Sequence, residues 1–325
     1  MDKIPYFSVV IPAYNAESTI TSTIRSVLEQ NLQDFEIIVI DDGSTDCTAE
    51  CATIVGDPRV SVYKIKNSGV STARNTGIAH ARGKCIAFLD ADDIWKRNHL
   101  DFAKRFFEEH PSVEWYASRY CICSPDVVET KRNETSTYDV LVANYLLGHR
   151  DSVSSSSVVL KREVLDSIDL FPDGVRYFED IIAWARLSAK SPNFGYQKET
   201  TVLYIRHECS FTGRYVSRSK YVTDYSHFLA YVADLQRLSS IYPGNKLFLS
   251  FTRKQILLYF LHCFKKNSDV SLENILQNYG HCFHYFIYVW LRGALWLCNF
   301  IKLVAIFPFM FLMNLKKVIV YRKSK

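Results

Sequence analysis

Three aspartates crowd the end of one apolar run, in the segment Asp90-Ala91-Asp92-Asp93. Residues i and i+2 of an extended backbone point to the same side, so the carboxylates of Asp90 and Asp92 can converge. Paired carboxylates at a strand end suit a hard divalent cation that keeps open positions for phosphate oxygens. The alternative is a solvated turn, because aspartate is common in turns. Crowded acids, however, repel one another unless something offsets their charge.

A second acidic pair, Asp41 and Asp42, opens the segment Asp41-Asp-Gly-Ser-Thr-Asp46 between a predicted strand and a predicted helix. Thr45 or Asp46 can cap that helix, but capping needs neither Asp41 nor Asp42. A carboxylate there can accept a hydrogen bond from a ring N–H of a base or from a ribose hydroxyl. A plain turn is the alternative.

A third pair, Glu179 and Asp180, begins a predicted helix that continues through Ile181, Ile182 and Trp184. Acids in the first turn are favoured by the helix dipole, which explains the pair without any chemistry. The functional alternative is a general base, and the same dipole would keep Asp180 ionised, as a base requires.

Other polar residues are ambiguous when taken singly. Arg74 and Asn75 lie in a predicted helix, and Arg74 is either a surface residue or a contact to a nucleotide or its phosphates. His207 follows a predicted strand, where a lone histidine is more often structural than a ligand. Several rival motifs are absent from the sequence: a Gly-x-Gly-x-x-Gly dinucleotide site, a Walker loop, His-Glu-x-x-His and Gly-x-Ser-x-Gly.

The first hundred residues alternate short apolar runs with helical patterns. Strands are predicted over 7–12, 35–40, 60–65 and 85–89, with helices over 18–30, 46–55 and 70–81. Strands that are apolar throughout and separated by helices indicate a mostly parallel sheet with helices on both faces, an α/β fold. Such sheets bind ligands at the carboxyl ends of their strands, so the polar segments after the first, second and fourth strands should face one crevice.

Beyond residue 98 the pattern is less regular. Helices are predicted over 98–109 and 179–190, strands over 113–123, 155–160 and 201–206, and a loop over 125–138. Residues 217–266 are helical in pattern and rich in aromatic side chains, and residues 282–321 are almost continuously apolar.

Four segments in this order closely resemble the family 2 glycosyltransferases, which have a GT-A fold. They are Val9-Val-Ile-Pro-Ala-Tyr-Asn15, Asp41-Asp-Gly-Ser-Thr-Asp46, Gly69-Val-Ser-Thr-Ala-Arg-Asn-Thr-Gly-Ile78 and Phe88-Leu-Asp-Ala-Asp-Asp93-Ile-Trp95. The resemblance is very specific over residues 7–100 and weaker, though ordered, to Thr212. No family-wide motif is found beyond about Ser217.

The resemblance implies an inverting, metal-dependent hexosyl- or N-acetylhexosaminyltransferase that uses a nucleotide-sugar donor, with a UDP-sugar expected. Residues matching the family's nucleotide-binding motifs would surround the base, ribose and phosphates: Pro12, Tyr14, Asn15, Asp41, Asp42, Arg74 and Asp90. Which of Asp41 and Asp42 touches the base stays open. Asp90 and Asp92 would be the Asp-x-Asp pair that binds Mg²⁺ or Mn²⁺, and His207 could add a further ligand. Asp180, with Glu179 beside it, would deprotonate the acceptor hydroxyl.

Charge is distributed unevenly along the 325 residues, whose net charge is +5. No Asp or Glu occurs from Asn274 to Lys325, a stretch with seven basic residues, and the rest of the chain has 32 basic against 34 acidic residues. The slightly acidic body argues against nucleic acid as a partner, because a protein that binds nucleic acid should have its positive patch on the folded domain. Hydrophobic residues at 48% exclude intrinsic disorder.

Localisation follows from the cysteines and the N-terminus. Nine scattered cysteines, an odd number, do not resemble a disulfide framework, and residues 1–5 have no apolar run typical of a signal peptide. We therefore expect a cytoplasmic protein.

The C-terminal segment indicates a membrane surface. Within residues 282–321 the longest run without charge, Leu303–Leu315, is shorter than the roughly 20 apolar residues of a spanning helix, so an in-plane helix with basic flanks fits better than a span or a soluble helix. With the family resemblance, this predicts a peripheral enzyme on the cytoplasmic face of the inner membrane. Its acceptor would be a glycan or lipid-linked glycan of O-antigen, capsule or lipopolysaccharide assembly.

The predicted domain organisation has four parts: a nucleotide-sugar-binding half over 1–100, an acceptor-binding half over 101–215, a helical extension over 216–281 and a membrane-associating tail over 282–325. Two other functions are alternatives to this glycosyltransferase activity. A nucleotidyltransferase should have a Gly-rich basic signature near the N-terminus, which residues 13–19 lack. A catalytically silent, membrane-bound scaffold of a polysaccharide assembly complex would not need Asp90, Asp92 and Asp180.

Overall fold

A computed structural model describes residues 3–147, 153–175, 179–206, 234–235, 237–242 and 244–252, all within one compact unit of residues 1–252. The second unit, residues 253–325, lies outside the described residues, and so do the predicted tail and most of the predicted helical extension. The predicted four-part division therefore stays a prediction.

The first four strands form a parallel sheet in the order β3-β2-β1-β4, as predicted. Their bounds are Phe7–Ala13 (β1), Phe35–Asp41 (β2), Val60–Lys64 (β3) and Cys85–Phe88 (β4). The connecting helices are α1 (Ile20–Leu28), α2 (Thr48–Ile54) and α3 (Val70–His80). Each lies inside its predicted range, because alternating apolar runs and helical periodicity are local signals.

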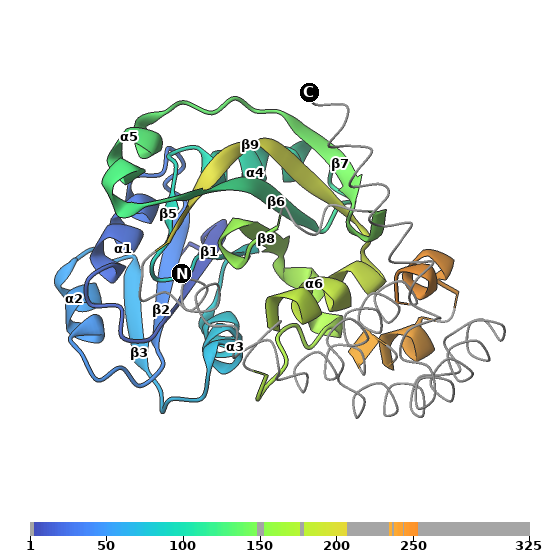
Figure 1. The fold of residues 1–325 in the computed structure, drawn as a ribbon, viewed down its shortest axis with the longest axis horizontal. Helices are drawn as coiled ribbons and strands as arrows, with labels where there is room; N and C mark the ends of the chain where they lie inside the picture. Colours follow the sequence, from blue (N-terminus) through green and yellow to red (C-terminus); the bar gives the residue numbers. More distant parts are fainter. Residues whose placement is uncertain are drawn as a thin grey trace, which may run out of the picture. The chain divides into compact units, whose positions relative to one another are not determined.

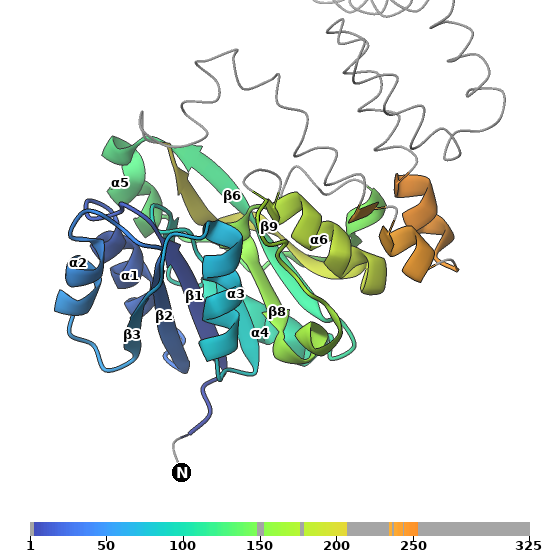
Figure 2. The ribbon, with the colours of Figure 1, turned by 90° about the horizontal axis from the view of Figure 1, so that it is seen from below.

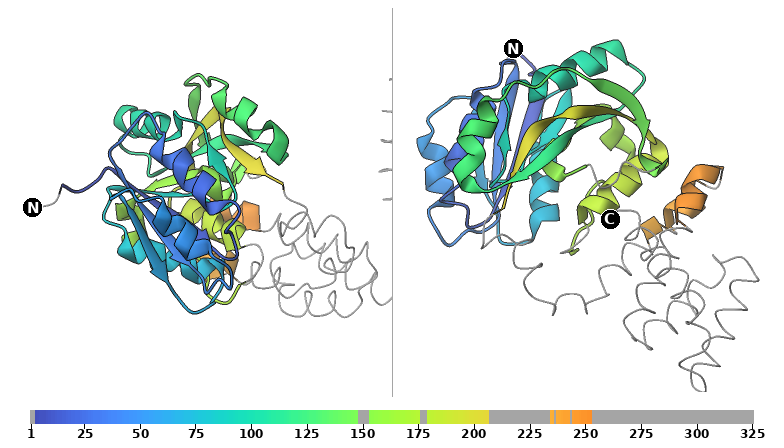
Figure 3. Two further views of the ribbon diagram at one scale, coloured as in Figure 1. Left: turned by 90° about the vertical axis from the view of Figure 1, so that its left-hand side faces the viewer. Right: turned by 45° about the horizontal axis from the view of Figure 1, so that its top comes forward.

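Beyond β4 the sheet is mixed. The full nine-stranded sheet continues through β8 (Val158–Lys161), β6 (Trp115–Cys123), β9 (Asn193–Ile205) and β5 (Ile94–Trp95), with β7 (Val140–Asn144) beside β9. Strand β8 is antiparallel to both β4 and β6, and the long β9 runs parallel to β6 (Figure 3). The prediction of a mostly parallel sheet thus holds for β1–β4 and the β6–β9 pair, whereas the pairs β4–β8, β6–β8, β5–β9 and β7–β9 are antiparallel.

Several predictions in this half need correction. The predicted loop over 125–138 contains the 3₁₀ turn η1 (Pro125–Val127) and the short helix α5 (Val128–Asn133). The predicted strand over 155–160 begins as the 3₁₀ turn η4 (Ser155–Ser157), and the strand predicted over 201–206 starts eight residues earlier. Strands β5 and β7 were not predicted. A charged one-turn helix and a two-residue strand are too short to produce a recognisable period.

The remaining helical elements complete the unit. They are α4 (His99–Glu109), α6 (Glu179–Lys190) and the 3₁₀ turns η2 (Tyr145–Leu147) and η5 (Arg162–Ser167). Helix α6 has the predicted bounds, 179–190. None of the helices in the described part of the chain has the length and apolar character needed to cross a bilayer.

Helices cover both faces of the sheet (Figures 1 and 2). Successive residues of β1 point to opposite sides: Val10 packs in the core with α3 and α6, whereas Val9 and Ile11 pack with α1, α2 and α4. Gly77 allows α3 to approach β1 closely, because a Cβ atom there would overlap the Val10 side chain. These two cores fix α3 and α6 on the same face of the sheet.

Candidate active site

The loops after β1 and β2 are joined by hydrogen bonds. The Asn15 side chain accepts from the Thr45 N–H at 2.9 Å, and the Asn15 N–H donates to the Ser44 hydroxyl at 3.0 Å. Asn15 has a positive φ of 49°, which asparagine tolerates better than most residues. Pro12 is buried within β1, whereas Tyr14 is 52% exposed at the strand end. Of these predicted contacts, Tyr14 and Asn15 are therefore accessible to a ligand, whereas Pro12 is not.

The two aspartates after β2 are both buried but differ in their partners. Asp42 accepts two backbone hydrogen bonds, from the Ser68 N–H at 2.7 Å and the Gly69 N–H at 2.8 Å, so it anchors the start of α3. Asp41 accepts from the Ser44 N–H at 2.9 Å through Oδ1. Among the hydrogen bonds of the described residues, none goes to Asp41 Oδ2, which leaves this oxygen available to a ligand.

The third aspartate cluster forms a tight turn after β4. The Asp93 N–H donates to the Asp90 carbonyl at 3.0 Å, and the Asp93 side chain is buried. Burial, together with the charges of Asp90 and Asp92, raises the pKa of Asp93 well above its ordinary value. Burial and the neighbouring Asp90 raise the pKa of Asp92 to about 6. A cation beside Asp90 and Asp92 would relieve this repulsion.

Arg74 connects this turn to α6. Its guanidinium is 2% exposed and pairs with Asp90 at 2.7 Å and with Glu179 at 3.3 Å. It also lies over the Phe171 ring, 5.1 Å from the ring centre. Burial opposes the charge, but Asp90 and Glu179 outweigh it and raise the pKa of Arg74. Arg74 is therefore not a surface residue; it joins acids that lie 89 residues apart in the sequence.

Glu179 and Asp180 occupy the first turn of α6, as predicted. Asp180 Oδ1 accepts from the Ile181 N–H at 2.7 Å. Burial raises the pKa of both acids, and Arg74 lowers it in part. The expectation that the helix dipole keeps Asp180 fully ionised is thus incomplete, because burial has the larger effect. A raised pKa strengthens a carboxylate as a base near neutral pH.

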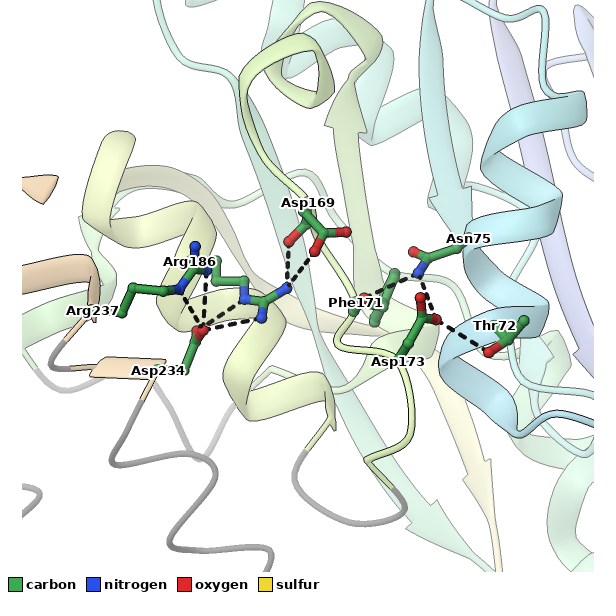
Figure 4. Close-up of polar contacts among 8 residues, drawn as sticks. All are labelled: Thr72, Asn75, Asp169, Phe171, Asp173, Arg186, Asp234 and Arg237. Atoms are coloured by element: carbon green, nitrogen blue, oxygen red, sulfur yellow. Dashed lines mark hydrogen bonds and ion pairs between the residues drawn. The ribbon is translucent and has the colours of Figure 1, made fainter.

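The loop before α6 is bound at both ends (Figure 4). Asn75 of α3 donates to the Phe171 carbonyl at 3.0 Å, and the Thr72 hydroxyl donates to Asp173 at 3.2 Å. At the other end, Arg186 of α6 donates to the Asp169 carbonyl at 2.6 Å. This loop therefore fixes Phe171 beneath Arg74.

The same Arg186 contacts a segment that follows later in the chain. Its guanidinium makes a bidentate pair with Asp234, at 2.9 and 3.0 Å, and Arg237 contacts the same carboxylate (Figure 4). The segment at 234–252 is thereby fastened to the helix that carries Glu179 and Asp180.

Comparisons with known proteins give the family of the chain. The family model Glycosyl transferase family 2 matches residues 8–169. TuaG of Bacillus subtilis, named for teichuronic acid biosynthesis, is 32% identical over 193 residues, which are 57% of this chain and 73% of TuaG. The chain belongs to glycosyl transferase family 2.

Two further relatives match different shares of the chain. WfgD of Escherichia coli, named as a UDP-Glc:α-D-GlcNAc-diphosphoundecaprenol β-1,3-glucosyltransferase, is 32% identical over 54% of this chain and 67% of its own. An uncharacterised glycosyltransferase of Rickettsia conorii is 30% identical over 82% of this chain, but the match spans only 43% of that protein.

The predicted GT-A fold is confirmed by a solved structure. TarS 1–349 of S. aureus, in complex with UDP-GlcNAc, superposes with a TM-score of 0.59 at 19% identity, covering 77% of this chain and 80% of the TarS 1–349 chain. Because the sequence identity is low, this likeness shows the shared fold alone.

Of the site residues that family 2 motifs predict, the structure brings Arg74, Asp90 and Glu179 into direct contact. His207 lies outside the described residues, and within the described part of the chain no cluster of three or more His, Cys, Asp or Glu side chains could hold a metal ion. Two carboxylates suffice for Mg²⁺ when phosphates and water supply the other ligands, so Asp90 and Asp92 fit such an ion.

Sequence reasoning missed two residues beside this site. Ser156 hydrogen-bonds to the acidic turn, and Phe171 lies beneath Arg74. Both are distant in sequence from the residues that they contact. A run of four serines before a strand was the available signal, but it does not distinguish Ser156 from its neighbours.

Proposed function

We propose that this chain is an inverting glycosyltransferase that transfers a sugar from a nucleotide-sugar donor to a hydroxyl group of a glycan. The observation that carries the proposal is the pairing of Arg74 with both Asp90 and Glu179. This pairing brings Asp90, a proposed metal ligand, close to Glu179 and the neighbouring Asp180. A transferase needs these two groups in one site, because the leaving diphosphate and the attacking hydroxyl lie on opposite sides of the sugar. Membership of family 2 supports the same activity.

The donor is proposed to be a UDP-sugar, either a hexose or an N-acetylhexosamine. The exposed Tyr14 ring and the unpaired Asp41 Oδ2 can contact the base, and Asn15 lies beside them. Asp42 is assigned to anchoring α3 rather than to the base, because both of its oxygens accept backbone hydrogen bonds. The TarS complex with UDP-GlcNAc and the name of WfgD support UDP as the nucleotide.

Asp90 and Asp92 are proposed to bind Mg²⁺ or Mn²⁺ together with the donor diphosphate, and His207 remains a proposed further ligand. Such an ion, when bound, stabilises the charge that develops on the leaving diphosphate. Arg74 limits how freely Asp90 can turn, because one of its oxygens accepts from the guanidinium at 2.7 Å.

Asp180 is proposed as the general base that takes the proton of the acceptor hydroxyl. Glu179 is paired with Arg74, whereas none of the ion pairs among the described residues involves Asp180. The carboxylate of Asp180 is therefore the better placed of the two to accept a proton, with Glu179 as its partner in the site.

The acceptor is proposed to be a lipid-linked glycan of bacterial surface polysaccharide synthesis, reached at the cytoplasmic face of the inner membrane. The support is the apolar, aromatic stretch after Asn274, which has seven basic residues and no acidic one. Further support comes from one relative named for teichuronic acid biosynthesis and one named for a diphosphoundecaprenol-linked acceptor. Basic residues are attracted to anionic lipids by about 1 kcal/mol each near the surface.

The activity is tested by UDP release from a panel of UDP-sugars with Mn²⁺ and a polyprenyl-diphosphate glycan. We expect Asp180→Asn to reduce turnover by at least about 100-fold without weakening UDP binding. Asp92→Asn should weaken UDP binding in Mn²⁺, and the exposed control Asp101→Asn should behave as wild type. Turnover of Asp180→Asn at the wild-type rate would refute the mechanism. UDP binding without transfer to any acceptor would favour the catalytically silent scaffold.

Membrane attachment is tested separately by sedimentation with vesicles of neutral or anionic lipid. Replacing Lys316, Lys317, Arg322 and Lys323 by glutamate in the full chain should abolish binding to anionic vesicles at low salt. Unchanged binding would refute the proposed role of the basic residues.

A further inference from the structure

Ser156 contacts the acidic turn at two points. Its hydroxyl accepts a hydrogen bond from the Asp90 N–H at 3.1 Å and donates a hydrogen bond to Asp93 Oδ2. Ser156 is 0% exposed and Asp93 is 1% exposed, so water does not replace these contacts. A hydroxyl has a single proton, and here it is committed to Asp93.

The backbone of Ser156 is itself fixed. It lies in η4, directly before β8, and its carbonyl accepts from the indole N–H of Trp95 at 2.7 Å. Trp95 is fully buried. Ser156 is thus a rigid point on the second half of the sheet, 66 residues from the aspartate that it contacts.

The other side of the turn is fastened as well. Asp93 Oδ1 accepts from the Ile205 N–H, at the end of β9, at 3.1 Å. The Thr23 hydroxyl of α1 contacts the carbonyls of Ala91 and Asp93, both at 3.0 Å. The turn that presents Asp90 and Asp92 is therefore tied to three elements: η4, β9 and α1.

Both oxygens of Asp93 accept hydrogen bonds from the protein, which distinguishes it from its neighbours. Asp90 uses one oxygen with Arg74, and Asp92 takes part in none of the ion pairs among the described residues. Asp93 thus has both carboxylate oxygens engaged by the protein and leaves a cation to the pair beside it.

We propose that Ser156 and Asp93 are positioning residues that keep the Asp90–Asp92 turn in the shape that binds a divalent cation and the donor diphosphate. The inference rests on the proposed function. Like charges in the turn tend to drive its carboxylates apart, and the Ser156–Asp93 contact opposes that spreading from two sides. Outer-shell partners of this kind typically contribute 10–100-fold to metal affinity.

The test compares Ser156→Ala with Ser157→Ala in the full chain. Ser157 is also 0% exposed, and its hydroxyl likewise makes two hydrogen bonds, donating to the Ser154 carbonyl at 2.8 Å and accepting from the Ser154 N–H at 3.1 Å. Neither bond involves the acidic turn. The two variants therefore delete the same buried group one residue apart, with and without contact to the aspartates.

Mn²⁺ affinity is measured by electron paramagnetic resonance in the presence of UDP, so the readout does not depend on turnover. We expect Ser156→Ala to weaken Mn²⁺ binding by about 10-fold or more, and Ser157→Ala to stay within about twofold of wild type. Turnover of Ser156→Ala should recover to within a few-fold of wild type at saturating Mn²⁺. Should Ser156→Ala fail to fold, Asp93→Asn takes its place with the same expectation.

The outcomes distinguish the positioning role of Ser156 and Asp93 from the existence of the metal site. Mn²⁺ binding by Ser156→Ala within twofold of wild type, with Asp92→Asn impaired, would overturn the positioning role and leave the metal site intact. An equal loss in Ser157→Ala would also overturn it. A wild-type chain that binds no Mn²⁺, or Asp92→Asn that binds Mn²⁺ as well as wild type, would overturn the metal site and the positioning role together.

Discussion

Arg74→Met would remove the buried cation that pairs with Asp90 at 2.7 Å and with Glu179 at 3.3 Å. With an effective dielectric constant of about 20, these two pairs have gross attractions of about 6 and 5 kcal/mol. Desolvation offsets much of this, and removing one partner of a buried pair costs about 3–5 kcal/mol. We expect the free energy of unfolding of the metal-free chain to fall by that amount at pH 7.5, which would lower the melting temperature by roughly 10 °C.

The loss should depend on pH. Burial raises the folded-state pKa of Glu179 and Asp180 above the unfolded value, so folding favours their protonated forms and stability falls as pH rises through that range. Arg74 lowers both pKa values, and its removal would therefore raise them further. The loss of unfolding free energy in Arg74→Met, relative to wild type, should be largest at pH 7.5. It should be smaller by about 1 kcal/mol or more at pH 5, where more of the acids are protonated.

Thermal unfolding in EDTA at the two pH values measures both effects. Arg97→Met is the control, because Arg97 pairs with Glu29 at 3.6 Å with both side chains exposed, and such a pair contributes at most about 1 kcal/mol. Arg74→Met with a loss below about 1 kcal/mol, or with the same loss at pH 5 and pH 7.5, would refute the reasoning that this arginine stabilises the site by charge pairing.

Three further changes test the fold around the site. Gly77→Ala should destabilise the chain by about 1–3 kcal/mol in urea unfolding, because the new methyl group would overlap Val10. Arg186→Met should lower the melting temperature and expose residues 234–252 to limited proteolysis, since it removes their bidentate ion pair. Asp57→Asn should destabilise at pH 7 by at most about 1 kcal/mol, because the pair with Arg59 lowers the pKa of this acid. That difference should shrink as pH falls below the ordinary aspartate pKa and vanish below the lowered pKa of the folded state.

Much of the site's framework was predictable from the sequence. Strands β1–β4 and helix α6 were located because apolar runs and helical periodicity involve neighbouring residues. The polar residues Tyr14 and Asn15 after β1 and the acids at the ends of β2 and β4 then had to lie at one edge of the parallel sheet, since parallel strands end on the same side. That reasoning predicts Asp41, Asp42, Asp90 and Asp92 as site residues from the sequence alone.

What the sequence could not predict depends on contacts between distant residues. Helix α5 and strand β5 are too short to produce a recognisable hydrophobic period. No pattern in the sequence of β8 indicates that it pairs antiparallel with β4. Nothing in the turn Asp41-Asp42 shows that Asp42 anchors the start of α3, because its hydrogen-bond donors lie 26 and 27 residues away.

The sequence by itself determined the fold class, the family and the identity of the acidic residues, because these follow from local periodicity and from short motifs in a given order. Only the tertiary structure decided which acids share a partner. Arg74 reaches Glu179 across 105 residues, and Ser156 reaches Asp93 across 63. The physical reason is that a hydrogen bond or an ion pair depends on distance in space, and folding alone brings α3, η4 and α6 to the carboxyl end of β4.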